Sequence, residues 1–214
     1  MSRGMEIEIY ADVVCPWCYV GKRRLEQALE SYDGDVTVHY RPFQLDPSPA
    51  PEPLPLLDAL AAKFGGRERA TQMAEHVTQV AAGAGLKLDF HRAIAANTFD
   101  AHRLVAWATA RGRAGETVEA LYRAHFSDGV DVGSRAALAT LAGAVGLDAA
   151  EARAFLDSDE RAADVRAALA AARQLGVTSV PTFVLAGRYA VVGAQEPETL
   201  LGALTEVEQR EAAA

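Results

Sequence analysis

Cys15 and Cys18 are the only cysteines of this 214-residue chain, and they stand three positions apart. From Met5 to Val14 the sequence first alternates and is then continuously apolar, which predicts a strand. The segment from Tyr19 to Tyr32 has helical character. A helix N-terminus has unpaired backbone N–H groups and about half a positive charge, and both favour a thiolate. We therefore expect Cys15 to be an acidic, accessible, attacking sulfur. Cys18, one turn further along the same helix face, is expected to resolve the mixed disulfide.

Two other roles for the cysteine pair are weaker. A structural disulfide across so short a loop removes little chain entropy, on the order of 2 kcal/mol, and ties together residues that a helix already holds. Half of a zinc site would need a second ligand pair, and the five histidines include no pair at zinc-ligand spacing: His39, His76, His91, His102 and His125. The cysteine pair therefore favours redox chemistry.

The composition is that of an ordinary globular protein, since 50% of the residues are hydrophobic and 23% are charged. The net charge of -8 comes without a strongly basic block, which excludes nucleic acid as a partner class. No apolar run approaches the ~20 residues of a membrane span, and Met1 to Glu8 lack the apolar region of a secretion signal. We expect a cytoplasmic protein with no membrane partner. In a reducing compartment a single cysteine pair is more often catalytic than structural.

The first helix and its neighbours form a predicted βαβ unit. Pro16 suits the first helical position because its fixed φ fits the helix and its missing N–H is not needed there. Charged side chains, Lys22 among them, fall mostly outside the apolar face of this helix. After a stop at residues 33–35, the segment Val36–Phe43 alternates as a second strand. Two strands joined by a helix predict a parallel pair with a right-handed crossover.

The middle of the chain has the pattern of a helical insertion. Asp46 to Pro55 holds five prolines and is predicted to be an extended connector. From about Leu54 to Leu175 helical patterns follow one another, with glycines at their ends and no convincing strand between them. The expected helices are Leu56–Phe64, Arg67–Ala84, Phe99–Arg111, Glu116–Ser127, Ser134–Val145, Ala149–Leu156 and Asp159–Leu175.

Strand character returns after Gly176. Val177–Leu185 is the expected third strand, and Arg188–Val192 is its expected antiparallel partner. A final helix begins near Pro197 and has four apolar residues on one face: Leu200, Leu201, Leu204 and Val207. The order of elements is therefore β-α-β, a series of helices, and then β-β-α.

That order, with the cysteine pair after the first strand and Pro181 in the third, resembles the thioredoxin fold with an inserted helical domain of the DsbA family. Three motifs resemble its FrnE-like branch, which is grouped with the 2-hydroxychromene-2-carboxylate isomerases: residues 12–21 around Cys15-Pro16-Trp17-Cys18, residues 97–103 from Asn97 to Arg103, and residues 176–183 from Gly176 to Phe183. The resemblance covers nearly the whole chain. It implies an α/β fold in which residues 1–45 and 173–214 form the two halves of a thioredoxin domain and residues 46–172 form an all-α insertion domain.

The resemblance also implies a role for Pro181. In such proteins the bond before the matching proline is cis, a form seen at about one X–Pro bond in twenty. A cis bond there would turn the backbone of Val180 toward the sulfurs, where it can pair with an extended substrate segment. Without the cysteines, Pro181 would simply begin an edge strand. Pro16 and Trp17, beside the cysteines, are further candidate substrate-binding residues. Trp17 replaces a histidine that many DsbA proteins carry, and because a neutral indole gives a thiolate no charge stabilisation, the redox direction stays open.

Three further polar residues have two interpretations each. Asp12 is either a proton relay to Cys18 or a loop-capping aspartate. Asn97 or Thr98 is expected to cap the helix that follows. His102 is either a core or interdomain histidine or a substrate contact.

The sequence therefore predicts a cytoplasmic thiol–disulfide oxidoreductase acting on a protein or a low-molecular-weight thiol or disulfide. No metal, flavin or nucleotide cofactor is implied, and glutathione is a candidate co-substrate. One rival is a glutathione-dependent isomerase or transferase of a small aromatic molecule, although such relatives typically carry a serine where Cys15 stands. The other rival is a chaperone-like binding protein. The apolar helical faces of the insertion are also compatible with a homodimer.

Overall fold

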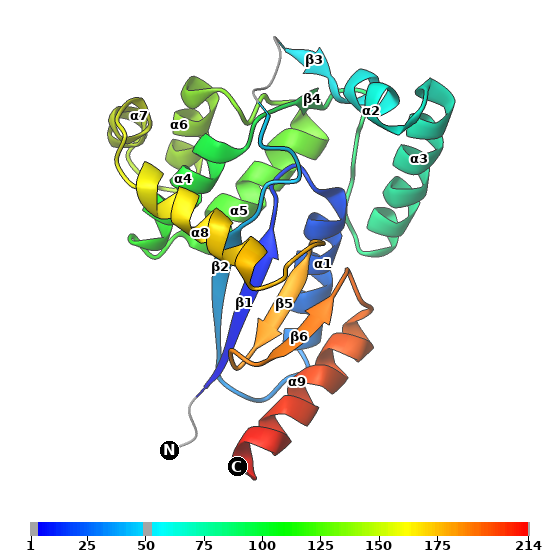
Figure 1. Cartoon of the computed structure of the whole chain (residues 1–214), viewed down its shortest axis with the longest axis vertical. Helices are drawn as coiled ribbons and strands as arrows, with labels where there is room; N and C mark the ends of the chain where they lie inside the picture. Colours follow the sequence, from blue (N-terminus) through cyan, green and yellow to red (C-terminus); the bar gives the residue numbers. More distant parts are fainter. Residues whose placement is uncertain (1–3, 49–52, 214) are drawn as a thin grey trace.

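A computed structural model describes residues 4–48 and 53–213, and Figure 1 shows a mixed α/β molecule built around one central sheet. The strand order in this sheet is β2-β1-β5-β6. Its members are β1 Met5–Ala11, β2 Val36–Pro42, β5 Thr182–Leu185 and β6 Tyr189–Val192. β1 pairs with β2 in parallel and with β5 antiparallel, and β5 pairs antiparallel with β6. The predicted parallel βαβ unit and the final antiparallel pair are thus confirmed.

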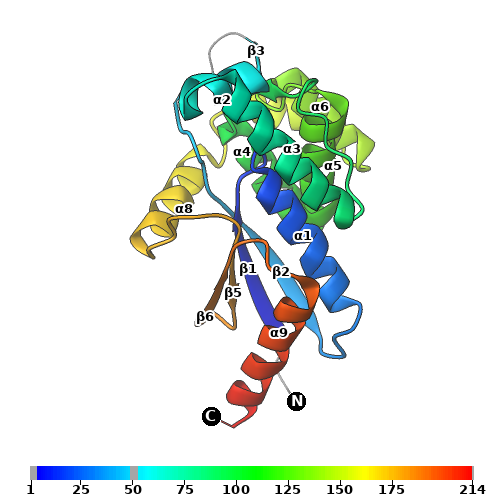
Figure 2. The ribbon, with the colours of Figure 1, turned by 90° about the vertical axis from the view of Figure 1, so that its right-hand side faces the viewer.

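Helices cover both faces of the sheet. Figure 2 shows α1 (Pro16–Leu29) and α9 (Pro197–Ala212) on one face and α8 (Ala162–Gln174) on the other. Pro16 and Pro197 both stand at the first helical positions, as their fixed φ predicts. β1 ends at Ala11, so the strand expected to reach Val14 was predicted too long. The reason is a turn in which the Cys15 N–H donates to the carbonyl of Asp12 at 3.0 Å.

The third strand is also shorter than predicted. β5 begins at Thr182, and the five residues before it form a loop rather than the start of a strand. The Val177 N–H donates to the carbonyl of Ala172, which closes the end of α8, and Pro181 has no N–H to give to a sheet.

At the other end of α8, Arg161 adopts a left-handed conformation with φ of 58°, so the helix begins three residues later than predicted.

The insertion contains the remaining elements. They are β3 Leu54–Pro55, α2 Leu56–Phe64, α3 Arg67–Gly83, β4 Ile94–Ala95, α4 Phe99–Thr109, α5 Ala114–Arg123, α6 Arg135–Ala144 and α7 Ala149–Asp157. The expectation of no strand in this region is wrong, because β3 and β4 pair antiparallel. Two residues are too few to show a strand period in sequence. Pro49 and Pro51 of the predicted proline-rich connector lie outside the described residues.

One predicted helix proves to be two pieces. The segment expected to run from Glu116 to Ser127 is α5 followed by a π-helical turn, Ala124–Asp128, that ends at Gly129 in a left-handed conformation. A π turn inserts one residue into the helical repeat and rotates the side chains that follow it. It places His125 and Phe126 in the interior, where both are fully buried.

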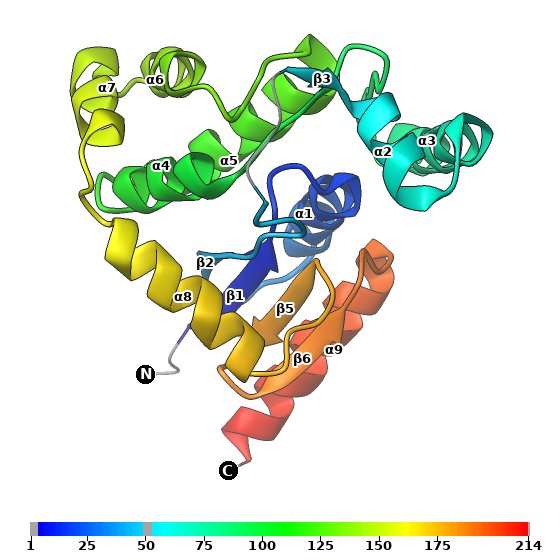
Figure 3. The ribbon, with the colours of Figure 1, turned by 45° about the horizontal axis from the view of Figure 1, so that its top comes forward.

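The sheet and the insertion share one hydrophobic core. Ile7 and Phe183 from the sheet and Leu104, Leu121 and Phe126 from the insertion are fully buried in a single cluster. α1 contacts both α3 and α5, and Figure 3 shows it between these two helices. Of the helices in the described ranges, none has the length and apolar character needed to cross a bilayer.

Candidate active site

Cys15 and Cys18 lie at the start of α1 as free thiols, one helical turn apart. Cys15 occupies the N-cap position, and no acidic residue stands in the first turn of the helix. The prediction that Cys15 is accessible is wrong, since only 4% of the residue is exposed. One group that encloses its sulfur is the Val180 carbonyl oxygen, 3.9 Å away. A sequence pattern could not reveal this cover, because it comes from a segment 165 residues away.

Cys18 is the deeper of the two thiols, with 1% of the residue exposed. Burial, the hydrogen bond with Cys15 and the charge of Cys15 raise the pKa of the Cys18 thiol well above its ordinary value. The Asp12 backbone N–H opposes this by donating to the sulfur, while the Asp12 charge adds to it. Cys18 is therefore protonated at neutral pH, and a resolving attack from it requires that its proton be removed.

The loop before β5 packs directly against α1. The Val180–Pro181 bond is cis, at the position where the family resemblance placed such a bond. A Cβ added to Gly21 of α1 would lie 2.8 Å from Cγ of Pro181, so only glycine leaves room for the buried proline ring. The Gly193 N–H donates to the Pro181 carbonyl at 2.8 Å. Packing on one side and a hydrogen bond on the other thus fix Pro181 beside the helix that carries the cysteines.

Val180 has an unpaired backbone N–H next to the thiols. The residue is half-buried, and its N–H makes no hydrogen bond to any residue in the described part of the chain. Its carbonyl faces the Cys15 sulfur. An unpaired N–H and a carbonyl on one residue are the groups that an extended peptide uses to add itself to a strand edge.

The insertion forms part of the surroundings of the cysteines. Trp17, half-buried in the first turn of α1, has its ring centroid 5.9 Å from that of His76 on α3. Met73, three residues before His76 on the same helix, is 42% exposed, and Leu45 is 47% exposed. We name Pro16, Trp17, Leu45 and Met73 the apolar rim. The sequence analysis proposed Pro16 and Trp17 for substrate binding and singled out neither Leu45 nor Met73, because each looks like an ordinary surface residue of its segment.

Asp12 lies behind the cysteines and is 1% exposed. Its Oδ2 accepts a hydrogen bond from the Leu45 N–H at 2.8 Å, which agrees with the loop-capping interpretation. Its Oδ1 lies 3.3 Å from Nε2 of His102, and the same Nε2 lies 2.9 Å from the Phe43 carbonyl oxygen. His102 belongs to α4 of the insertion, so the interdomain interpretation of this histidine is the one that the structure bears out.

Asn97 supplies the hydrogen bond to the start of α4. Its side-chain Oδ1 accepts from the Phe99 N–H at 2.9 Å, and its Nδ2 donates to the Ser48 carbonyl at 2.8 Å. Thr98 occupies the N-cap position without a side-chain hydrogen bond to the helix. The predicted cap is therefore present, and it is the Asn97 side chain that makes it.

Tyr122 is a buried neighbour of the dithiol that the sequence did not single out. Burial, followed by the charges of Cys18 and Cys15, raises the pKa of its hydroxyl well above the ordinary value, and its ring stacks on Tyr19 with 4.9 Å between centroids. In the sequence it occupies an apolar position of an amphipathic helix, which is indistinguishable from an ordinary core tyrosine.

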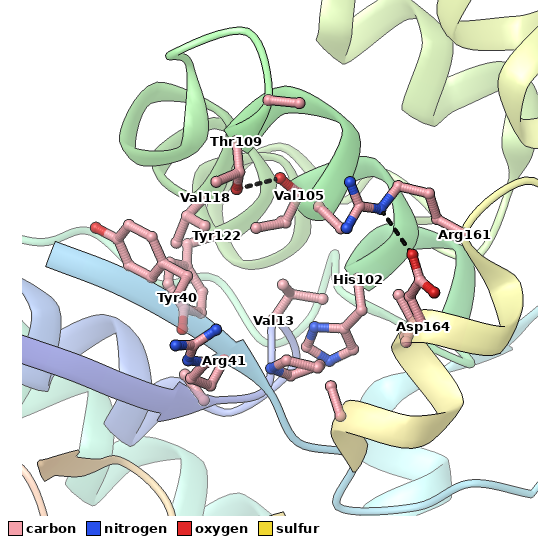
Figure 4. A pocket seen from close by; sticks show the side chains of 16 residues that line it. Val13, Tyr40, Arg41, His102, Val105, Thr109, Val118, Tyr122, Arg161 and Asp164 are labelled. Atoms are coloured by element: carbon pink, nitrogen blue, oxygen red, sulfur yellow. Dashed lines mark hydrogen bonds and ion pairs between the residues drawn. The ribbon is translucent and has the colours of Figure 1, made fainter. Parts of the chain in front are cut away.

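A cavity of about 280 Å³ is lined by His102 and by residues of the sheet and of three helices. Figure 4 shows the side chains around it, which come from the end of β1, from β2, and from α4, α5 and α8. Its polar lining comprises Tyr40, Arg41, His102, Thr109, Tyr122, Arg161 and Asp164, and neither cysteine belongs to the lining. Within residues 4–48 and 53–213, no group of three or more His, Cys, Asp or Glu side chains is arranged to hold a metal ion.

The profile of the DSBA-like thioredoxin domain matches residues 6–205 of the chain. The chain belongs to the DsbA-like thioredoxin-domain family. A second member, described as a probable DsbA oxidoreductase from Streptomyces coelicolor, is 42% identical, with a TM-score of 0.88 over 94% of this chain and 89% of that one. The predicted fold class, a thioredoxin fold with a helical insertion, is therefore confirmed.

Two other solved structures share the DsbA-like fold at lower identity. A 2-hydroxychromene-2-carboxylate isomerase is 18% identical, with a TM-score of 0.70 over 97% of this chain and 98% of its own. The cytosolic disulfide reductase DsbM from Pseudomonas aeruginosa is 21% identical, with a TM-score of 0.64 over 96% of this chain and 98% of its own. The DsbA-like fold thus supports both redox and isomerase chemistry, and the side chains of each member must decide between them.

Proposed function

We propose that this DsbA-like protein catalyses thiol–disulfide exchange through Cys15 and Cys18. The observation that carries the proposal is the pair of free thiols in the first turn of α1, beside a loop whose Val180 N–H is unpaired within the described residues. Cys15 occupies the N-cap position of α1, and the N-terminus of a helix is where unpaired N–H groups and the positive dipole end are found.

The reaction runs through two successive attacks. The Cys15 thiolate attacks one sulfur of a substrate disulfide, the substrate S–S bond breaks, and the second substrate sulfur leaves as a thiolate. Cys18, once deprotonated, attacks the Cys15 sulfur of the mixed disulfide. The products are a Cys15–Cys18 disulfide and a fully reduced substrate, and the reverse sequence oxidises a dithiol.

We place the substrate across the apolar rim and the Val180 backbone. Main-chain hydrogen bonds to Val180 would hold an extended segment of any sequence, and the rim would contact its side chains. A protein disulfide fits this surface, and so does a small peptide such as glutathione. DsbM has been solved with glutathione, which supports glutathione as a co-substrate here. Because DsbM is a cytosolic disulfide reductase of the same fold, a cytoplasmic location is part of the proposal.

The second candidate function is a glutathione-dependent isomerisation, which the fold shared with the 2-hydroxychromene-2-carboxylate isomerase favours. An isomerisation of this kind does not require the second thiol, Cys18. Both thiols are present in the first turn of α1, which supports exchange over isomerisation. A chaperone-like binding role would need neither thiol.

Single cysteine variants test the proposal. With a disulfide-bonded reporter peptide, we expect Cys15→Ser to abolish reduction and Cys18→Ser to accumulate a mixed disulfide at Cys15, seen as the added peptide mass. Titration in glutathione buffers would show one reversible two-electron couple in the wild type and none in either variant. Undiminished turnover by Cys15→Ser, or the absence of a trapped species in Cys18→Ser, would overturn the assignment.

A further inference from the structure

Resolution by Cys18 requires the loss of a proton from a site that is closed to solvent on the substrate side, where Cys15 is 4% exposed and Cys18 is 1% exposed. Asp12, 1% exposed, is a second potential negative charge in the same interior. A thiolate and a carboxylate together, without a nearby cation, would carry a large desolvation penalty. The structure must therefore contain a compensating charge or lose much of its resolving rate.

His102 is placed to supply that charge. Its Nε2 faces two acceptors, the Phe43 carbonyl oxygen at 2.9 Å and Asp12 Oδ1 at 3.3 Å. A nitrogen between two acceptors carries the hydrogen, so the pattern of contacts assigns the neutral ring a proton on Nε2 and a lone pair on Nδ1. Within the described residues Nδ1 has no hydrogen-bond partner, and it is not among the buried polar atoms sealed from solvent.

The cavity gives Nδ1 access to water. His102 lines the cavity of about 280 Å³ together with groups from β2, α5 and α8, as Figure 4 shows. The other titratable or charged groups in that lining are Tyr40, Arg41, Tyr122, Arg161 and Asp164. Arg161 and Asp164 pair with each other at 3.4 Å, and Arg41 pairs with Glu8. Asp12 is therefore the carboxylate that His102 itself contacts.

We propose that His102 is a positioning residue for the resolving step, and that it becomes protonated on Nδ1 through the cavity as Cys18 becomes a thiolate. The Cys18 proton passes to the substrate thiolate released by the first attack, and a proton from the cavity water joins Nδ1, so the buried set of Cys18, Asp12 and His102 keeps its net charge. The Cys18 electron pair then forms the bond to Cys15, the bond from Cys15 to the substrate breaks, and the substrate sulfur leaves with that pair. His102 afterwards returns its proton to the cavity water.

This inference rests on the proposed exchange function and predicts something beyond it. The insertion would contribute to the redox step itself, through a histidine on α4, in addition to forming part of the substrate surface. A purely structural His102 would need only the Nε2 hydrogen bonds to Asp12 and Phe43. A glutamine can donate such a bond and cannot be protonated, so His102→Gln separates the two roles.

The test uses the reduced full chain mixed with a chromogenic aromatic disulfide in a stopped-flow instrument. The first thiol released reports attack by Cys15, and the second reports resolution by Cys18. We expect His102→Gln to slow the second release about tenfold at pH 7 while the first stays within twofold of the wild type. The pH profile of the second release should lose one titration step in His102→Gln and keep it in the wild type. Thr109→Val, which changes the same cavity wall without touching Asp12, should leave both releases unchanged.

Chemical rescue of a second variant still distinguishes the two roles of His102 if His102→Gln disturbs the packing around α4. His102→Ala leaves a ring-sized space open to the cavity, and added imidazole should restore the second release, whereas pyrazole, equal in size and not basic at neutral pH, should not. The inference is overturned if His102→Gln resolves at the wild-type rate, if both releases slow together, or if pyrazole rescues as well as imidazole. A chain that shows no second release in the wild type would instead contradict the proposed function.

Discussion

At the level of single residues, Cys18 links the redox state to the pH dependence of stability. Its pKa is raised by burial, so the unfolded chain loses this proton first as the pH rises. The stabilising contribution is complete below the ordinary cysteine pKa, about 8.5, and is lost above it. We expect the free energy of unfolding of the reduced protein to fall between pH 8.5 and 9.5, and Cys18→Ala to flatten this fall. Urea titrations at three pH values would measure it, and parallel curves would contradict it.

His125 has the opposite effect, at acidic pH. The ring is fully buried in the π turn, both of its nitrogens lack hydrogen-bond partners within the described residues, and burial lowers its pKa to about 4. A depressed pKa gives stability that is present above the ordinary value of about 6.5 and lost as the pH falls toward 4, by on the order of 3 kcal/mol.

We therefore expect His125→Leu to remove most of this acid destabilisation and to unfold no more easily than the wild type at pH 7, because the leucine leaves no buried polar atom unpaired. Thermal unfolding followed by circular dichroism at pH 4.5 and pH 7 measures both effects. His91→Leu, at an exposed position, is the matched control. Equal pH dependence in the two variants would show that His125 does not titrate as described.

The residues whose place in the fold could be predicted from the sequence are those that local spacing positions. Cys15, Cys18 and the proline at position 181 belong to short motifs, and Pro16 follows from helix geometry. The cover over Cys15 and the burial of Lys22 could not be predicted, because each depends on contact with a segment about 100 or more residues away. Lys22 was expected on the polar face, and it is 5% exposed because α5 lies over it.

At the level of elements, the packing of α1 on the Pro181 loop gives a direct test. A methyl group on Gly21 would meet the rigid proline ring at 2.8 Å. We expect Gly21→Ala to lower the free energy of unfolding by about 1 to 3 kcal/mol, as overpacking does, and to slow thiol exchange by moving Pro181 relative to Cys15. Gly202→Ala in α9 is the control, since an added Cβ there meets nothing within 4 Å.

The control should act in the opposite direction. Gly202 lies in a helix interior, where alanine is favoured over glycine by roughly 0.5 to 1 kcal/mol, so Gly202→Ala should stabilise the protein and leave exchange unchanged. Denaturant melts and exchange rates of the two variants decide the matter. If Gly21→Ala were as stable as Gly202→Ala, α1 and the loop would not be in the close contact described.

Helices were the elements most open to prediction, because their periodicity and terminal glycines are local signals. α2 has the predicted bounds, and α3 ends one residue earlier than predicted. The errors fall where nonlocal contacts or unusual backbone decide the outcome. β3 and β4 exist only because they meet each other, and the π turn after α5 has the same apolar pattern as a continuing helix.

At the level of the whole molecule, a charged cluster joins α1 to the insertion. Glu119 on α5 accepts hydrogen bonds from Lys22 Nζ at 2.6 Å, from Tyr19 Oη at 2.8 Å and from Arg23 Nη2 at 2.9 Å. Burial alone would raise the pKa of the Glu119 carboxyl, and the hydrogen bond and charge of Lys22 lower it below its ordinary value. One carboxylate thus joins the helix of the cysteines to the helix that carries Tyr122.

We expect Glu119→Ala to lower the free energy of unfolding at pH 7 by about 3 kcal/mol, the lower end of the range for breaking a buried ion pair, because Glu26 still contacts Lys22. The depressed pKa means that the glutamate stabilises the fold above its ordinary pKa of about 4.3 and ceases to do so as the pH falls below it. The difference between variant and wild type should therefore shrink at pH 3.5.

Hydrogen exchange would locate the loss. If the cluster holds the insertion against α1, amides of α4 and α5 should lose protection in Glu119→Ala before those of β1 and β5 do. Glu206→Ala removes an exposed α9 carboxylate paired with Arg210 and should change the free energy of unfolding by less than about 0.5 kcal/mol. Uniform loss of protection across sheet and insertion would mean that their shared core, rather than the Glu119 cluster, sets how firmly the two parts of the molecule are joined.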